Sequence, residues 1–329
     1  MGVRRHAAEA LATGLAIVLL ASCGAMRTPR STTSTTSASP AAGTWSRAVT
    51  VAPGADLSVV SCPVAGFCLA GSTSGASFRL SGGKIGALGA VAPAAAPPGV
   101  SYLSCTSTSF CAAAPDLNHV VLFNGTSWLP PATLPAAQGI TAIDCVGPTF
   151  CITIDGEGNS FAFNGTRWSG NLGAWGAASQ ISCASPQFCV AAEGAPSVWD
   201  GRHWTQPLSV DPLGQLNSVS CASASFCMVV DSGGNALTWD GTEFSAPSPV
   251  ATEPPLSGTD ASGLTGVSCP SATFCRAVDS IGRVFAFDGK KWDAGTLIDN
   301  GRALTSISCP SPRYCLAVDR SGHAFVWGG

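Results

Sequence analysis

The sequence of 329 residues predicts an all-β fold made of seven repeats, each about 40 residues long. Two observations predict it. A pair of cysteines separated by five residues occurs seven times, and each pair lies in the same order of apolar runs and turns, which are typical of strands throughout. The first cysteines of successive pairs are 43, 40, 38, 38, 48 and 40 residues apart. This period is typical of a four-stranded sheet repeated around an axis.

The first two strands of each repeat are expected on either side of the cysteine pair. The first strand ends at the first cysteine and has an aliphatic residue two positions earlier in all seven repeats. The second strand opens with the second cysteine and runs to an acidic or Gly-containing turn. An Asp side chain caps such a turn by bonding the backbone two residues on. Four of the turns begin with Asp155, Asp231, Asp279 and Asp319.

The third and fourth strands are expected to form a tight hairpin. The third strand is an apolar run such as FAF, LTW or AFVW, and in five repeats Asn-Gly or Asp-Gly follows it, as at Asn124-Gly125. These dipeptides between apolar runs are the strongest short signal for a hairpin. The fourth strand is expected to begin with an aromatic residue, at Trp128, Trp168, Trp204, Phe244 and Trp292.

The two ends of the repeat array predict a closed ring. The seventh repeat stops at Trp327-Gly328-Gly329, where its fourth strand is due, whereas Gly43-Thr44-Trp45-Ser46 near the N-terminus is similar to the start of the fourth strand elsewhere. Residues 44–51 are therefore expected to supply the outer strand of the last repeat, which leaves only short edges. The predicted fold is a seven-bladed β-propeller of four-stranded blades over residues 44–329.

The N-terminus resembles a bacterial lipoprotein signal peptide. Arg4 and Arg5 precede an apolar run over 10–21 that is too short to span a bilayer, and Leu20-Ala21-Ser22-Cys23 matches a lipobox. The resemblance implies a signal peptide over 1–22, a lipidated Cys23 that anchors the chain on the outer side of the cell membrane, and a Ser/Thr-rich tether to residue 43. The alternative is an ordinary secretory signal with an incidental cysteine.

The cysteine count agrees with export from the cytoplasm. Fourteen of the fifteen cysteines fall into the seven pairs, and Cys23 is the remaining one. A pair that brackets a hairpin turn in an exported protein indicates a disulfide between the first two strands. Metal ligation is the alternative, but zinc sites favour closer spacing, so no metal is expected. The pairs are Cys62/Cys68, Cys105/Cys111, Cys145/Cys151, Cys183/Cys189, Cys221/Cys227, Cys269/Cys275 and Cys309/Cys315.

Composition narrows the classes of function. The net charge is −3 and the chain has only three lysines, so no basic stripe exists and no nucleic-acid partner is expected. After the signal peptide the sequence has three histidines, His119, His203 and His323, and none lies in a recognisable nucleophile motif. The sequence therefore assigns no catalytic residue and no cofactor.

The turns between the second and third strands share one face of the ring with the connectors between blades, and this face carries the variable residues. Loops on a rigid scaffold are where binding usually resides, so we expect a funnel for a protein or carbohydrate ligand there. The alternative is that these acids only start turns and face solvent, and that Trp175, which lies outside the repeat pattern, covers a loop. The candidate binding residues are Asp155, Glu157, Glu193, Asp231, Asp279, Asp319 and Trp175.

With these residues in view, the chain resembles seven-bladed propellers of the WD40, YVTN and NHL kind, presented as an actinobacterial-type surface lipoprotein. It lacks the Trp-Asp and Gly-His signatures of WD40 repeats, so no functional residues can be transferred from that family. We predict a lipid-anchored extracytoplasmic binding or scaffolding module. The alternatives are a purely structural envelope protein and a carbohydrate-active enzyme, a lyase or glycosidase, whose carboxylates would come from Asp155, Glu157, Glu193 and Asp231.

Overall fold

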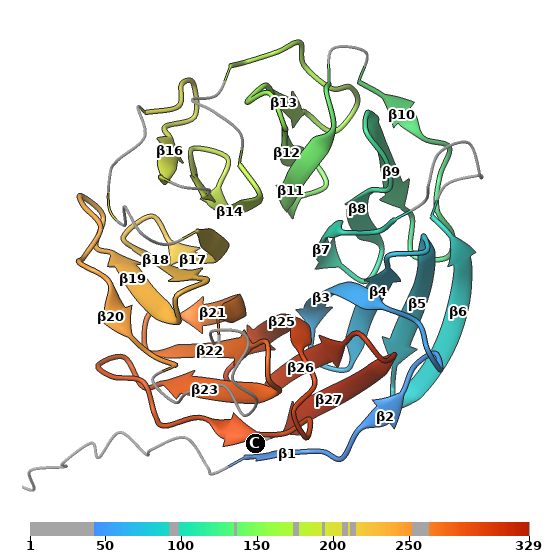
Figure 1. The fold of residues 1–329 in the computed structure, drawn as a ribbon. Coiled ribbons are helices and arrows are strands. Elements are labelled where there is room, and N and C mark those ends of the chain that lie inside the picture. Colours follow the sequence, from blue (N-terminus) through green and yellow to red (C-terminus); the bar gives the residue numbers. More distant parts are fainter. Residues whose placement is uncertain are drawn as a thin grey trace, which may run out of the picture. The chain divides into compact units, whose positions relative to one another are not determined.

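The computed structural model describes residues 43–91, 99–134, 137–173, 178–192, 195–205, 210, 215–251 and 263–328. The elements in these ranges are β-strands, and they form seven antiparallel sheets around a central axis (Figure 1). The predicted seven-bladed propeller is thus confirmed, with one sheet for each repeat. In the described ranges no helix is long and apolar enough to cross a membrane.

Each blade runs outward from an innermost strand beside the axis. The innermost strands are β3 (Leu57–Val64), β7 (Tyr102–Ser107), β11 (Ile140–Gly147), β14 (Gln180–Ser185), β17 (Leu216–Ser223), β21 (Leu264–Ser271) and β25 (Leu304–Ser311). The second strands are β4 (Phe67–Ser72), β8 (Phe110–Ala114), β12 (Phe150–Asp155), β15 (Phe188–Ala192), β18 (Phe226–Asp231), β22 (Phe274–Asp279) and β26 (Tyr314–Asp319).

In blades 2 to 7 the outer half is shorter and less regular than the inner half. The third strands are β5 (Ala76–Ser81), β9 (His119–Phe123), β13 (Ser160–Phe163), β16 (Ser197–Trp199), β19 (Asn235–Trp239), β23 (Arg283–Phe287) and β27 (His323–Gly328). The outermost strands are β6 (Lys84–Ala90), β10 (Ala132–Thr133), β20 (Ser248–Pro249), β24 (Thr296–Leu297) and, for the last blade, β1 (Thr44–Trp45) with β2 (Val49–Thr50). Blades 3 and 4 have no fourth strand within the described residues.

The turn between the first two strands is tighter than the sequence predicts. The innermost strand does not end at its first cysteine but continues two residues past it. In blade 3, for example, Gly147 pairs with Phe150, which leaves a two-residue turn. A register shift between Cys145 and Gly147 makes this possible, because a bulge lets the strand bend into a short turn.

The second cysteine does not open its strand, which corrects the prediction from the sequence. It is the second residue of the strand, because the aromatic residue before it already pairs with the innermost strand, as Phe150 does with Gly147. All seven second cysteines have 0 % of their surface exposed, so they lie in the core between neighbouring blades. They are Cys68, Cys111, Cys151, Cys189, Cys227, Cys275 and Cys315.

The outer strands differ from the continuous strands that the sequence predicts. The aromatic residue that should open the strand makes a single bridge to the third strand, as Trp168 does with Phe163, and the ladder then breaks. In blades 3 to 6 the next residue repairs the break with its side chain. In blade 3, Ser169 donates its N–H to the carbonyl of Ala162 over 2.8 Å, and its Oγ accepts the N–H of Ala162 over 2.9 Å. A side-chain oxygen thus replaces the backbone carbonyl of a regular ladder.

The N-terminal segment closes the ring, as the sequence predicts. Both β1 and β2 pair with β27, the third strand of the seventh blade, with Trp45 opposite Trp327 and Val49 opposite Ala324. The two tryptophan rings lie 5.8 Å apart. The last blade therefore contains strands from both ends of the domain, which ties the first blade to the seventh.

The apolar core lies between blades rather than within one sheet. Each core cluster combines residues of two neighbouring blades, as where Met228 and Val230 of blade 5 pack with Leu264, Val267 and Phe285 of blade 6. Blades therefore stabilise one another by face-to-face burial, and an isolated blade would expose both of its faces to water.

Seven disulfides join the innermost and second strands, one in each blade, with the pairing that the sequence predicts. In blade 2, Cys105 lies directly opposite Cys111, with their Cα atoms 4.0 Å apart. Such a close pair is typical of the position in an antiparallel ladder where facing residues exchange no hydrogen bonds, so the N–H of the first cysteine points away from its own sheet. The disulfides are Cys62–Cys68, Cys105–Cys111, Cys145–Cys151, Cys183–Cys189, Cys221–Cys227, Cys269–Cys275 and Cys309–Cys315.

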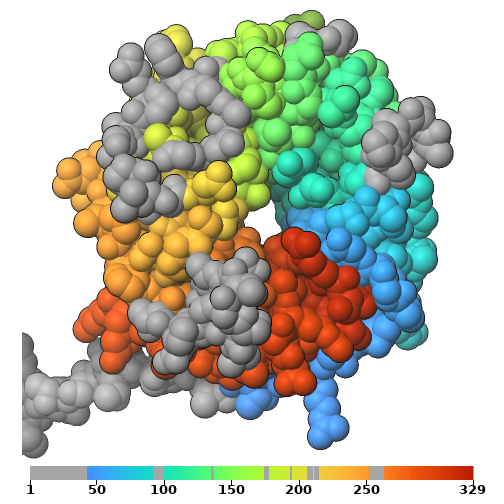
Figure 2. All heavy atoms as spheres, in the orientation of Figure 1, coloured from blue at the N-terminus to red at the C-terminus, as the bar shows by residue number. Residues whose placement is uncertain are grey.

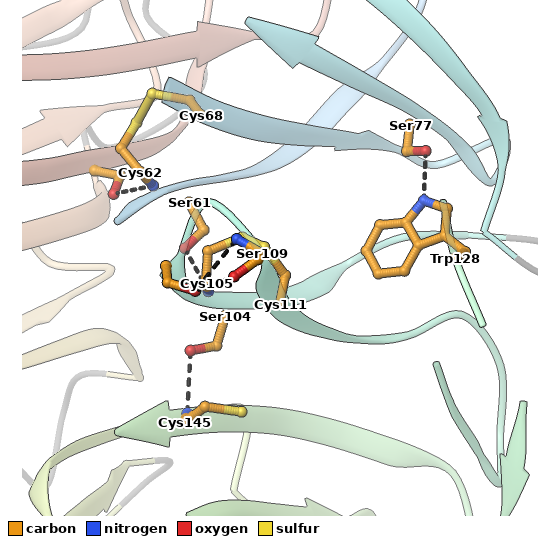
Figure 3. Close-up of a disulfide and its surroundings, with 12 residues drawn as sticks. Ser61, Cys62, Cys68, Ser77, Ser104, Cys105, Ser109, Cys111, Trp128 and Cys145 are labelled. Atoms are coloured by element: carbon orange, nitrogen blue, oxygen red, sulfur yellow. Dashed lines mark hydrogen bonds between the residues drawn. A yellow bond between two sulfur atoms is a disulfide. The ribbon is translucent and has the colours of Figure 1, made fainter. Parts of the chain in front are cut away.

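A neighbouring blade satisfies each of these N–H groups. The residue before the first cysteine of one blade accepts a hydrogen bond from the first cysteine of the next, and Figure 3 shows this for Ser61 with Cys105 and for Ser104 with Cys145. The seven bonds are 2.7–3.0 Å long and run in one direction around the axis. We call the accepting residues the belt: Ser61, Ser104, Asp144, Ser182, Ser220, Ser268 and Ser308.

Removal of one belt hydroxyl should measurably destabilise the ring. Ser268→Ala would leave the N–H of Cys309 without its acceptor at 2.9 Å, and we expect the free energy of unfolding to fall by about 1–2 kcal/mol. Urea denaturation of the oxidised protein measures the change. Ser127→Ala is the control, because Ser127 is exposed in a hairpin turn. Equal stability of both variants would contradict this role of the belt.

Candidate functional site

One end of the ring axis opens into a cavity of about 460 Å³, which we call the funnel mouth. It lies where the innermost strands begin and the second strands end, on the face that carries the turns between second and third strands. The hollow at the centre of the ring is visible in Figure 2. The lining residues are Asp56, Ser58, Thr73, Ser179, Gln180, Asn217, Thr265, Ser280, Ala303, Leu304, Thr305 and Arg320.

Hydrogen bonds between blades hold the wall of the mouth in place. Near the start of an innermost strand, a polar side chain donates to a backbone carbonyl of the following blade. Thr265 Oγ1 donates to the carbonyl of Leu304 over 2.6 Å, and Thr305 Oγ1 donates to the carbonyl of Leu57 over 2.7 Å. Asn217 Nδ2 donates in the same way to the carbonyl of Leu264 over 2.9 Å. The wall is therefore organised before any ligand arrives, which lowers the entropy cost of binding.

The four aspartates that the sequence selects as candidates lie behind this wall, at the ends of the second strands. Asp155, Asp231, Asp279 and Asp319 each have 0 % of their surface exposed. In every case Oδ1 accepts the backbone N–H of the residue four positions on, over 2.7–2.8 Å. They begin turns, as the sequence predicts, but they are buried in those turns and do not face solvent.

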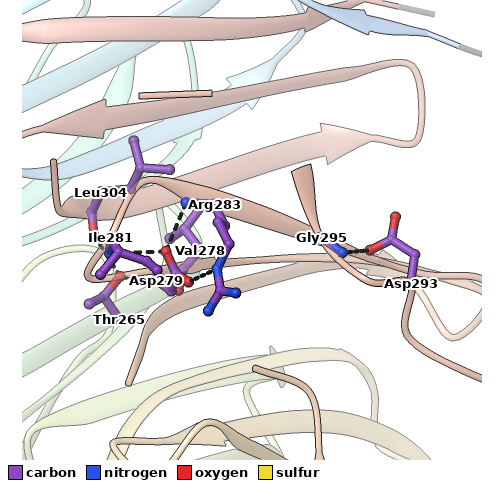
Figure 4. Close-up of polar contacts among 8 residues, drawn as sticks. All are labelled: Thr265, Val278, Asp279, Ile281, Arg283, Asp293, Gly295 and Leu304. Carbon is purple, nitrogen blue, oxygen red and sulfur yellow. Dashed lines mark hydrogen bonds and ion pairs between the residues drawn. The ribbon is translucent and has the colours of Figure 1, made fainter. Parts of the chain in front are cut away.

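Both carboxylate oxygens of Asp279 accept hydrogen bonds. Its Oδ1 accepts the N–H groups of Ile281 and Arg283, and its Oδ2 accepts Arg283 Nε–H over 2.7 Å (Figure 4). Asp155 binds the backbone and side chain of Asn159 in a similar way, and also the N–H of Gln138. These carboxylates stabilise turns and connectors, and in this arrangement Asp155 and Asp231 do not form a pair that faces a substrate across the axis.

Of the remaining candidates, one is exposed and two lie outside the described residues. Glu157 is exposed in the turn after Asp155, with its backbone N–H donated to Asp155 Oδ1 over 3.0 Å. A role for its carboxylate in binding stays a prediction. Glu193 and Trp175 lie outside the described residues, as does Cys23.

A carboxyl pair that the sequence did not indicate lies beside the mouth, between blades 6 and 7. Asp299 is in the connector before β25 and is 5 % exposed, and its carboxyl contacts that of Asp319. Burial, followed by the hydrogen bond and the negative charge of Asp319, raises the pKa of Asp299 to about 6. Burial also works to raise the pKa of Asp319, but hydrogen bonds from the backbone and side chain of His323 and from Asp299 outweigh it and lower the pKa. Of the two carboxyls, Asp299 therefore holds a proton more tightly than Asp319 does.

Deeper along the axis, the innermost strands of all seven blades surround a second cavity of about 220 Å³, which we call the channel. Its lining includes Asp144, the belt residue of blade 3. Oδ1 of Asp144 accepts the hydroxyl of Ser104 over 2.7 Å, and Oδ2 accepts the N–H of Cys183 over 2.7 Å. Burial raises the pKa of Asp144 to about 6, although these hydrogen bonds work to lower it. Alignment of the residues before each first cysteine would have revealed Asp144 as the exception among serines.

A third cavity, of about 610 Å³, lies on the flank of the ring between blades 5 and 6. Phe226, Phe287 and Trp292 contribute to its wall, and Lys290 and Lys291 lie at its edge. In the described part of the chain, no cluster of three or more His, Cys, Asp or Glu side chains could hold a metal ion.

Comparison with known proteins identifies the fold and no family. No family model matches the chain, and no curated protein matches it. Among solved structures, YCF48 bound to D1 peptide superposes with a TM-score of 0.69 at 14 % identity, covering 87 % of this chain and 97 % of that one. The RRP9 WD40 repeats give 0.72 at 11 % identity, covering 86 % and 97 %. The WD40 β-propeller domain of Doa1 gives 0.69 at 10 %, covering 87 % and 97 %.

These neighbours define a class. The chain is a seven-bladed, WD40-like β-propeller with one disulfide in each blade. At these identities the similarity shows the fold alone, and the site has to be argued from this chain's own residues.

The raised pKa of Asp299 should make the stability of the protein depend on pH. Its pKa is about 6 in the folded protein against an ordinary 3.8, so the folded state holds the proton more tightly. This contribution is fully present below pH 4 and is lost as the pH rises through 6. Asp299→Asn cannot ionise, so we expect a smaller loss of stability between pH 5 and pH 7 than in the wild type, measured by urea denaturation.

The control for this experiment is Asp288→Asn. Asp288 is an exposed turn residue, and hydrogen bonds from the backbone of Lys291 and Lys290 lower the pKa of its carboxyl, which therefore stays ionised across this range. The control variant should keep the wild-type pH dependence. The same dependence in Asp299→Asn would show that the pKa of Asp299 is not raised in the folded protein.

Proposed function

We propose that this protein is a binding module that captures a segment of a protein or peptide at the funnel mouth. The observation that carries the proposal is the cavity of about 460 Å³ whose wall is fixed by hydrogen bonds between successive blades. A rigid concave site with polar groups at its rim is the usual form of a binding site on a closed β-scaffold. The YCF48 structure with its D1 peptide supports a peptide as the ligand class.

The chemistry of the rim also favours a peptide over a carbohydrate. Thr73, Gln180, Ser280 and Arg320 line the mouth and offer amide, hydroxyl and guanidinium groups that can pair with a peptide backbone. None of the described residues that line the mouth is aromatic, so this part of the wall offers no flat apolar face for a sugar ring. The recurring tryptophans are used in packing, as with Trp128 against Phe123.

We further propose that the module is held on the outer side of a bacterial cell membrane by a lipid on Cys23. The lipobox Leu20-Ala21-Ser22-Cys23 supports this location, and so do the seven disulfides, because disulfides persist in oxidising compartments outside the cytoplasm. The Ser/Thr-rich tether before residue 44 would give the propeller reach from the membrane surface.

Blocking the mouth should weaken binding. Peptides selected by display against the full-length chain provide the probe, and fluorescence anisotropy gives their Kd. Thr73→Arg and Ser280→Arg put a bulky charged side chain at the rim, and we expect at least a tenfold weaker Kd, which corresponds to about 1.4 kcal/mol.

Ser127→Arg adds the same side chain in an exposed turn between the third and fourth strands and should leave the Kd unchanged. Failure to select any peptide that is sensitive to the two rim variants would overturn the proposal. Sensitivity to Ser127→Arg alone would place binding on the other face of the ring.

The anchor is tested in a bacterial host that expresses the full chain. Cys23→Ser removes the sulfur that would carry the lipid, so we expect loss of fatty-acid labelling and release of the protein from the membrane fraction. Ser22→Ala keeps a small residue before the cysteine and should remain labelled and membrane-bound. Identical fractionation of Cys23→Ser and the wild type would favour an ordinary secretory signal.

A further inference from the structure

The belt uses a carboxylate in one blade where a hydroxyl is sufficient in the other six. Ser182 Oγ accepts the N–H of Cys221 over 2.9 Å, and Asp144 does the same for Cys183 over 2.7 Å. A serine at position 144 would therefore satisfy the same backbone group. A carboxylate in a confined space costs desolvation energy, so Asp144 adds a cost that ring assembly does not require.

The described residues that line the channel provide no counter-charge for Asp144. Among the described residues that line it there is no lysine, arginine or histidine, and Tyr102 of β7 is the other titratable group. Each carboxylate oxygen accepts one of the hydrogen bonds from Ser104 and Cys183. The backbone N–H of Cys145 is a further donor, and because a carboxylate offers about four acceptor positions, Asp144 retains capacity for one more.

The channel can be reached from the funnel mouth. Gln180 lines both cavities, and it lies three residues before the first cysteine of blade 4. Asp144 lies one residue before the first cysteine of blade 3, so it is two residues, or about 7 Å, further along the axis. An extended lysine or arginine side chain covers such a distance while its backbone stays in the mouth.

We infer that the channel is a subsite for one positively charged side chain, the ammonium of lysine or the guanidinium of arginine, with Asp144 as its counter-charge. The inference rests on the proposed peptide binding at the mouth and names the chemistry of the residue that enters deepest. Binding pairs the confined carboxylate with a cation and replaces water in the channel. A charge-assisted hydrogen bond of this kind is about twice as strong as a neutral one.

The subsite is tested with two short peptides, acetyl-Gly-Gly-Lys-Gly-Gly-amide and the same peptide with its lysine acetylated on Nζ. Isothermal titration calorimetry on the full-length protein at pH 7.5 measures both. We expect the acetylated peptide to bind at least tenfold more weakly, because it has lost its charge. Asp144→Ser should reduce the affinity for the charged peptide to the same level, while it keeps the belt residue that six other blades use.

The pH profile adds a readout that a purely structural role would not change. Since burial raises the pKa of Asp144 to about 6, the wild type should bind the charged peptide progressively less well as the pH falls from 7.5 to 5. Asp144→Ser should show no such decline. Asp288→Asn is the control, because Asp288 is an exposed turn acid that lines neither the mouth nor the channel, and this variant should preserve both the affinity and the pH profile.

The outcomes separate this inference from the proposed function. A peptide that is blocked by Thr73→Arg but unaffected by Asp144→Ser and by lysine acetylation would overturn the channel subsite alone. Absence of any peptide sensitive to Thr73→Arg would overturn the proposed function itself. Binding of sodium or potassium ions at Asp144, without binding of the lysine peptide, would overturn the assignment to a basic side chain.

Discussion

The structure depends on how the innermost strands satisfy the N–H groups that point away from their own sheets. An edge strand leaves every second backbone group unpaired, and a buried unpaired N–H is costly. Here a belt residue of one blade accepts the N–H of the first cysteine in the next, as Ser220 does for Cys269 over 2.9 Å. Because the bonds run in one direction, no blade satisfies its own edge, and only a closed ring satisfies all seven.

The need to satisfy these N–H groups explains why serine and threonine are common near the axis and why the ring has to be closed. Serine and threonine are small enough for seven strands to converge, and their hydroxyls reach the neighbouring backbone. The first blade depends on the seventh, since Ser308 accepts the N–H of Cys62 and Thr305 donates to the carbonyl of Leu57. Pairing of β1 and β2 with β27 secures the same junction at the outer edge. Each disulfide keeps the first cysteine at the ladder position where its N–H points away from its own sheet and toward the neighbouring blade.

The sequence predicts the architecture that the repeats share, and it fails on strand ends and on contacts between segments far apart in the chain. Blade number, strand order, cysteine pairing and ring closure each follow from patterns that seven copies reinforce. The turn aspartates were identified, but residue type could not show that Asp155 and Asp319 are buried, because burial depends on connectors from elsewhere in the chain. The Asp299–Asp319 pair unites a connector with a turn, so no local pattern contains it. The break in the outer strands was missed because Ser169 substitutes a side chain for a backbone acceptor.

The difference between repeated residues and residues that depart from the repeat also indicates where ligand specificity can arise. Most polar groups near the axis are already engaged in holding one blade to the next, so a repeated residue there cannot bind a ligand without weakening the ring. A residue can do both only if it keeps the hydrogen bond to the next blade and has capacity left over. Asp144 meets this condition, since Oδ2 accepts the N–H of Cys183 while the carboxylate still offers an acceptor position to the channel. Recognition in this propeller is therefore expected from the exceptions to its repeat, placed on a scaffold that the repeat makes rigid.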